Sequence, residues 1–120
     1  MSDNKPQVPQ AVQSCHELIA WMVPKIDQFP RNQRFTLGDR IYTRLLDVLE
    51  LLIEAAYTTN KRKILNQANH CLAVVRHLWR LCLELKVINH KAYGHGGTLL
   101  VDLGKQVGGW QKKAAGRVSS

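Results

Sequence analysis

The sequence has 120 residues, with 17 Lys and Arg against nine Asp and Glu, and a formal net charge of +8. This length favours a single domain. No apolar run approaches the roughly 20 residues that span a bilayer, and the first residues lack the basic and apolar segments of a secretory signal. We therefore expect a cytoplasmic protein with no membrane partner, in which the three cysteines are reduced core residues.

The positive charge is concentrated in the second half of the chain. Residues 1–54 hold six Lys and Arg with seven Asp and Glu, whereas residues 55–120 hold eleven Lys and Arg with only Glu84 and Asp102. Such a balance is typical of proteins with an acidic partner, and nucleic acid is the first candidate. A charge that only keeps the protein in solution is the alternative.

The first predicted helix covers residues 10–28 and follows a polar tail at residues 1–9, which we expect to be mobile. Its apolar residues recur with helical spacing at Leu18, Ile19, Met22, Val23 and Ile26. Pro24 lies inside this pattern and should kink or loosen the helix. The Phe-Pro pair that follows should end it, and residues 31–35 are then a short linker.

The second predicted helix, residues 37–58, is the most strongly amphipathic segment. Thr36 is placed to cap it, with Asp39 in the capping-box position. One face is apolar and is expected in the core: Ile41, Leu45, Val48, Leu49, Leu52 and Ala56. The opposite face forms an acidic stripe that comprises Thr43, Asp47, Glu50, Glu54 and Thr58.

The third predicted helix covers residues 61–86, after a turn in which Asn60 can act as the N-cap. Its apolar positions are Ile64, Leu65, Ala68, Cys71, Leu72, Val75, Leu78, Cys82 and Leu85. Its outer face is cationic and amide-bearing, the reverse of the second helix, and comprises Arg62, Asn66, Asn69, Ala73, Arg76 and Arg80.

The fourth predicted helix covers residues 89–113, with Leu99, Leu100, Leu103, Val107 and Trp110 on its apolar face. Six glycines in this segment disfavour a helix, because each costs up to about 1 kcal/mol of helix stability in a helix interior. A break at residues 95–97, with Thr98 capping a shorter helix, is the alternative. We predict a continuous helix, because Ile88 and Ala92 continue the helical spacing of its apolar residues. We expect a mobile tail at residues 114–120.

Short links between long amphipathic helices place successive helices antiparallel. The sequence therefore predicts an all-α fold, an up-down four-helix bundle formed by residues 10–113. It contains no strand pattern or internal repeat.

No constellation of residues predicts catalysis or cofactor binding. No two of the five histidines are four residues apart, and no two cysteines have CxxC spacing. The segment of residues 94–97 follows no strand and lacks the Lys-Ser/Thr of a phosphate loop. We therefore predict a non-enzymatic protein that needs no metal or cofactor.

Two groups of basic residues are candidates for nucleic-acid contact. The first lies on the third and fourth helices, where almost no acidic residues interrupt it: Arg62, Arg76, Arg80, Lys105, Lys112 and Lys113. The second surrounds the start of the second helix and comprises Arg31, Arg34, Arg40 and Arg44, of which Arg40 and Arg44 share a side. This second group either contacts phosphate groups or forms ion pairs with Asp39 and Asp47.

The acidic stripe is either a solvated face or an oligomer interface. In the second interpretation Asp47, Glu50 and Glu54 meet the basic stripe of a neighbouring copy, and head-to-tail contacts close into a ring. The three tryptophans are expected as core or interface anchors. Trp110 is the candidate for the oligomer interface.

The segment FPRNQRFTLGDRI, residues 29–41, resembles the signature of the Avd-like four-helix-bundle family, as do Leu85-Lys86 and residues 107–110. The family includes the accessory variability determinants (Avd) of diversity-generating retroelements and bundle proteins encoded in intervening sequences of rRNA genes. The resemblance covers most of the chain from about Leu18 onward. It implies a four-helix bundle that assembles as a homopentameric barrel.

The resemblance also implies a function. Avd-like proteins of retroelements bind the reverse transcriptase and its template RNA, and they support mutagenic cDNA synthesis without being enzymes themselves. From the basic residues of the third and fourth helices we expect sequence-tolerant binding to RNA and to DNA–RNA hybrids. The alternative is an rRNA-associated bundle, or a general helical protein-interaction bundle, without a reverse transcriptase partner.

Overall fold

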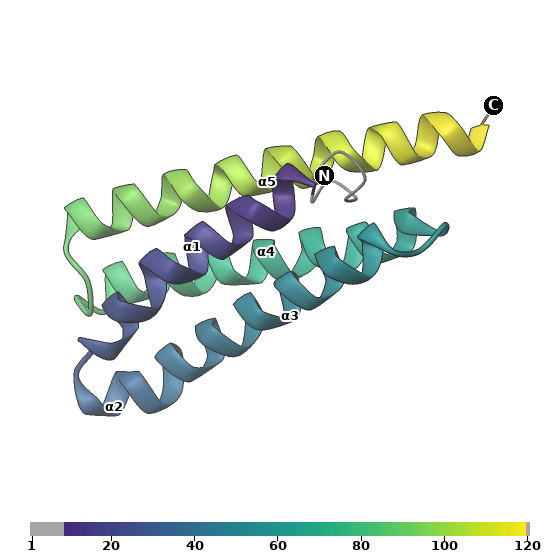
Figure 1. Ribbon diagram of the computed structural model, residues 1–120. Helices are drawn as coiled ribbons and strands as arrows, with labels where there is room; N and C mark the ends of the chain where they lie inside the picture. The colour runs from purple at the N-terminus through teal and green to yellow at the C-terminus, as the bar shows by residue number, and fades with distance from the viewer. Residues whose placement is uncertain (1–8, 120) are drawn as a thin grey trace, which may run out of the picture.

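The computed structural model describes residues 9–119, with side chains to Ala115. Four long helices form an antiparallel bundle: α1 (Gln10–Asp27), α3 (Asp39–Ala56), α4 (Lys61–Glu84) and α5 (His90–Ser119) (Figure 1). Between α1 and α3 lie α2 (Arg31–Gln33) and the π-helical turn η2 (Arg34–Gly38). There is no strand within residues 9–119, so the predicted all-α bundle is confirmed. The expected N-terminal tail lies, apart from Pro9, outside the described residues.

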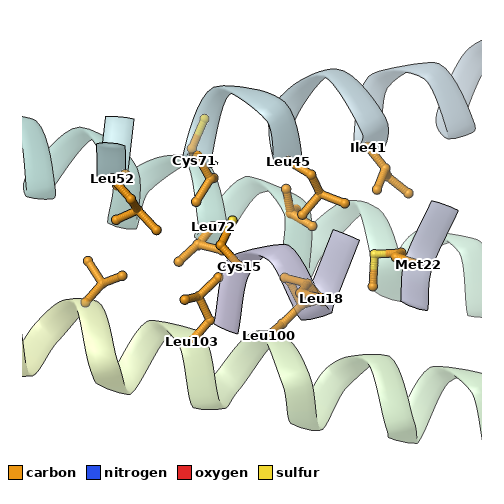
Figure 2. Close-up of a cluster of buried hydrophobic side chains, with 14 of the residues drawn as sticks. Cys15, Leu18, Met22, Ile41, Leu45, Leu52, Cys71, Leu72, Leu100 and Leu103 are labelled. Carbon is orange, nitrogen blue, oxygen red and sulfur yellow. The ribbon is translucent and has the colours of Figure 1, made fainter. Parts of the chain in front are cut away.

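The core lies along the axis between the four helices. Each long helix packs against two others, because α1 and α4 both contact α3 and α5. Figure 2 shows apolar side chains from all four helices meeting at this axis, among them Leu18, Met22, Ile41, Leu45, Leu52, Leu72, Leu100 and Leu103. Burying each such side chain stabilises the fold by about 1.5–3 kcal/mol. The helical periodicity predicted these positions, and the structure confirms them.

Two predicted core positions differ in the structure. Ala56 is only half-buried, and its neighbour Ala55 is buried in the core instead. The side chain of Leu85 is 53% exposed, because α4 ends at Glu84 and the chain turns away from the core. Pro24 lies within α1, and the helix continues beyond it to Asp27. The kink expected at this proline stays a prediction. None of the described helices is long and apolar enough to cross a membrane.

The predicted linker and N-cap before the second long helix are wrong. Residues 31–38 are helical, so one nearly continuous helical path leads into α3. The Thr36 hydroxyl donates a hydrogen bond back to the Asn32 carbonyl oxygen (2.9 Å) instead of capping a helix. Gly38 explains the turn, since a Cβ there would lie 2.9 Å from Ile26 Cγ2 of α1. The glycine therefore lets η2 pack against α1.

The turn between α3 and α4 is closed by a lysine. Asn60 occupies the predicted N-cap position, but its side chain makes no capping hydrogen bond. Instead the Lys61 ammonium donates to the carbonyl oxygens of Ala55 (2.7 Å) and Thr58 (2.8 Å). These bonds satisfy carbonyl groups that the end of α3 leaves without helical partners.

α5 is continuous through its glycines, as predicted, and it extends to Ser119, beyond the expected end at residue 113. The side chain of Asn89 caps its start, because Asn89 Oδ1 accepts a hydrogen bond from the Ala92 amide (2.8 Å). The alternative, a break at residues 95–97, does not occur.

Candidate nucleic-acid interface

The arginines of α4 lie on its α5 side. Arg62, Arg76 and Arg80 are all exposed. Arg76 reaches across to α5, where a Cβ at Gly104 would lie 3.2 Å from Arg76 Nη1. Arg80 pairs with Glu84 (3.4 Å), but both side chains are more than half exposed. Solvent screens such a pair, so Arg80 stays available to another anion.

α5 continues this surface. An amide bridge holds the two helices together, because Asn69 Nδ2 donates to Gln111 Oε1 and Gln111 Nε2 donates to Asn66 Oδ1, both at 2.5 Å. The three lysines predicted for α5 are exposed. The first group of predicted residues is thus brought onto two adjoining helices. We call it the basic surface: Arg62, Arg76, Arg80, Lys105, Lys112 and Lys113.

The two arginines at the start of α3 have different surroundings. Arg40 is exposed, whereas Arg44 is half-buried between α3 and α4, with its Nη1 atom 3.9 Å from Cys71 Sγ. The ion pairs expected with Asp39 and Asp47 do not form, since Arg80–Glu84 is the only ion pair in the part of the chain that the structure describes. Arg40 and Arg44 therefore lie on the α3 side of α4, away from the basic surface.

An acidic groove of about 900 Å³ runs between α3 and α4. Asp47, Glu50 and Glu54 line it from α3, and His70 is among the residues that line it from α4. Its apolar lining comes from Leu51, Ile53 and Cys71. The three acids that the sequence assigned to an oligomer interface are therefore brought together in one groove. Arg44 also lines the groove, so three carboxylates and one guanidinium give it a net negative charge, opposite to that of the basic surface.

The tryptophans are anchored in the bundle. Trp79 is 1% exposed, and Trp110 is half-buried against the core. Trp21 packs edge-on to Trp79, with ring centroids 6.1 Å apart, and stacks at a tilt on His95 at 4.6 Å. Trp110 thus contributes to packing within the subunit, and its predicted contact with a neighbouring copy stays a prediction.

A second apolar stripe on α3 was missed by the sequence analysis. It comprises Tyr42, Leu46, Ile53 and Tyr57, which are 39–81% exposed. Their spacing of four, eleven and fifteen residues places them on one side of the helix, and this signal was present in the sequence. Ile53 also lines the acidic groove, so the apolar stripe and the groove adjoin.

The cysteines are core residues, as predicted. All three are buried and free. Burial raises the pKa of the Cys15 thiol to about 12 and that of the Cys82 thiol to about 11, so both stay protonated at neutral pH and are poor nucleophiles. Within the described residues, no group of three or more His, Cys, Asp or Glu could hold a metal ion.

These features define a small four-helix bundle whose basic and acidic surfaces lie on different sides of one chain. The family described as bAvd-like matches residues 10–114. The chain therefore belongs to the bAvd-like family, which confirms the resemblance found in the signature segment. No curated protein matches the chain, and no solved structure does.

Proposed function

We propose that this protein is a basic, non-enzymatic accessory protein of a diversity-generating retroelement. It binds the element's reverse transcriptase and template RNA, and it supports mutagenic cDNA synthesis in the cytoplasm. Membership of the bAvd-like family supports this proposal. The observation that carries the RNA-binding part is the basic surface, where six exposed cationic side chains extend along α4 and α5.

Binding by this surface is electrostatic. Lys and Arg that contact phosphates displace counterions, so affinity for a single strand falls with rising salt by a slope of about 0.7 per phosphate neutralised. Contacts to phosphates carry no sequence information. Single-stranded RNAs of unrelated sequence should therefore bind with affinities similar to one another, and so should DNA–RNA hybrids of unrelated sequence.

A titration of fluorescent RNA at two salt concentrations tests the proposal. The Arg76→Glu, Arg80→Glu double variant should bind at least tenfold more weakly than wild type and show a shallower salt slope. Lys63→Glu with Lys91→Glu is the matched control, because it reverses the same number of exposed cations on α4 and α5 outside the basic surface. Wild-type binding that ignores salt would show that the basic surface does not contact RNA.

The protein partner needs its own test. The gene neighbourhood should hold a reverse transcriptase and template and variable repeats, and the two proteins should co-purify. If the protein binds that enzyme but not RNA, the basic surface docks an acidic face of the enzyme instead. If neither binding is found, the rRNA-associated or general protein-interaction bundle is the better assignment.

We also propose that the protein acts as a closed homo-oligomer, which the family resemblance implies is a pentamer. Two observations support self-assembly. The basic surface and the acidic groove have opposite charges and lie on different sides of the chain, which favours a head-to-tail contact that can close into a ring. The apolar stripe beside the groove supplies surface that would be buried in such a contact. In this arrangement Asp47, Glu50 and Glu54 face cations of the neighbouring copy.

A further inference from the structure

Phe35 is an exposed aromatic residue at the end of the bundle where the chain passes from α1 to α3. Its side chain is 57% exposed. It belongs to η2, whose inner side packs against the bundle, because Gly38 is buried against Ile26 and Leu37 packs against the core. Single π-helical turns recur at functional sites in proteins. The fold therefore presents this ring to solvent on a fixed turn.

Arginines surround the ring. The guanidinium carbon of Arg34 lies 5.0 Å from the centroid of the Phe35 ring. Arg31 and Arg40 are exposed nearby, and none of the three forms an ion pair within residues 9–115. Three guanidinium groups therefore lie around the ring, and Asp39 is the one carboxylate in the groove beside it, so the surroundings carry a net positive charge.

A groove beside the ring is large enough for a small planar ligand. Its volume is about 540 Å³, within the range of roughly 300–1,000 Å³ for small-ligand pockets. It is lined by Phe35, Thr36, Leu37, Asp39, Arg40, Thr43 and Leu78, the last from α4. Asp39 is the one acidic group in this lining. The groove thus combines an aromatic face, a cation and hydroxyl groups.

We propose that Phe35 is a stacking platform for an unpaired base of single-stranded nucleic acid, and that Arg34 and Arg40 contact its flanking phosphates. The inference rests on the proposed nucleic-acid-binding function and adds a contact separate from the basic surface. Arg34 lies over one face of the ring, and the face that it leaves uncovered can stack any base. A duplex keeps its bases stacked inside and offers none to the ring. Phe35 therefore makes the protein prefer single strands to duplexes without selecting a sequence.

The experiment compares single-stranded and duplex RNA of equal length. Phe35→Ala should weaken binding of the single strand about tenfold and change binding of the duplex less than twofold. Its salt slope should match wild type, since no charge is removed. Phe35→Trp should keep the affinity, and the fluorescence of the added indole should be quenched by the single strand. Leu85→Ala is the control, because Leu85 is a large apolar residue of similar exposure, 53%, that belongs neither to the apolar stripe nor to the groove beside Phe35.

Substitution of the two arginines tests their proposed contacts with phosphates separately. Arg34→Gln with Arg40→Gln should weaken single-strand binding and lower its salt slope by about one to two phosphate contacts. One outcome would refute the stacking site and leave the proposed function standing. In that outcome Phe35→Ala binds the single strand as tightly as wild type, whereas Arg76→Glu, Arg80→Glu loses affinity. Equal losses for single strand and duplex, or a changed oligomer size, would assign Phe35 to a protein contact instead. Wild-type protein that binds neither RNA would refute the proposed function itself.

Discussion

Gly96 of α5 lies directly against the indole of Trp79 in α4. A Cβ at Gly96 would come 2.7 Å from Trp79 Nε1 and 2.8 Å from two ring carbons. The indole is buried, and its Nε1 donates a hydrogen bond to the Tyr93 carbonyl oxygen (3.1 Å). Only glycine allows the backbone of α5 to approach the ring so closely. One of the glycines that lower the helix propensity of α5 thus also docks the helix on the core.

We expect Gly96→Ala to lower the free energy of unfolding by about 1–3 kcal/mol, because the added methyl group displaces either the indole or the helix. Gly94→Ala is the matched control in the same helix, since nothing lies within 4 Å of its added Cβ. That variant should be more stable than wild type by up to about 1 kcal/mol. Urea denaturation followed by circular dichroism measures both, and similar effects of the two changes would contradict the close contact.

Lys86 ends α4 in a left-handed conformation, with φ of 62°. The Val87 amide donates to the Cys82 carbonyl (2.8 Å) and the Lys86 amide to the Leu83 carbonyl (2.9 Å), which is the Schellman pattern of helix ends. Because a side chain costs roughly 1–2 kcal/mol in this conformation, Lys86→Gly should raise the free energy of unfolding by about 1 kcal/mol. Lys86→Ala keeps the strained φ and should leave thermal stability close to wild type. A stabilised alanine variant would point to the lysine charge instead.

The buried thiols predict a pH dependence. In the unfolded chain Cys15 and Cys82 ionise near their ordinary pKa of 9.0, but in the folded protein burial raises their pKa to about 12 and about 11. Between pH 9 and these values the folded state holds more protons, so the free energy of unfolding falls as pH rises. Each thiol contributes at most about 1.4 kcal/mol per pH unit. The Cys15→Ala, Cys82→Ala variant should show a smaller decrease over this range.

The sequence predicted most of the core, because burial follows helical periodicity when a helix has neighbours on one side only. Ile41, Leu45, Leu72 and Leu103 are buried where their spacing placed them. The ends of the helices were harder to predict. Thr36 matches a local capping signal, yet the chain around it is helical, and Gly38 in the same turn packs closely against Ile26 of α1. Such a contact joins two elements, so local sequence signals do not reveal it.

For the surface residues, the sequence predicted exposure that depends on one helix alone but not exposure that depends on neighbouring elements. Exposed cations such as Arg76 and Arg80 follow from a single helix, because their side of α4 has no apolar residues to cover. Arg44 shares a side with Arg40 in sequence, but α4 covers it and brings it to Cys71. The exposure of Phe35 depends on the π-helical turn, which the sequence analysis treated as a linker. These positions depend on how elements pack together.

The apolar stripe of α3 predicts how the subunits associate. Leu46 and Ile53 are 39% and 41% exposed on one side of α3, and Ile53 borders the acidic groove. If neighbouring copies cover this side, Leu46→Glu with Ile53→Glu places charges in a buried contact, where an unpaired charge is strongly unfavourable. We expect this variant to be monomeric at micromolar concentration by light scattering, with the helical circular dichroism of wild type.

A control on other helices and a second variant in the groove make the test specific to α3. Leu81 of α4 and Val101 of α5 have similar exposure, 37% and 44%, and lie on other helices. Leu81→Glu with Val101→Glu adds the same charge to the protein, so it should keep the wild-type oligomer size if the stripe forms the contact. A second variant, Glu50→Lys with Glu54→Lys, reverses charge in the groove and should dissociate the oligomer more readily at low salt than at high salt. Wild-type protein that is a stable monomer at micromolar concentration would refute the proposed ring.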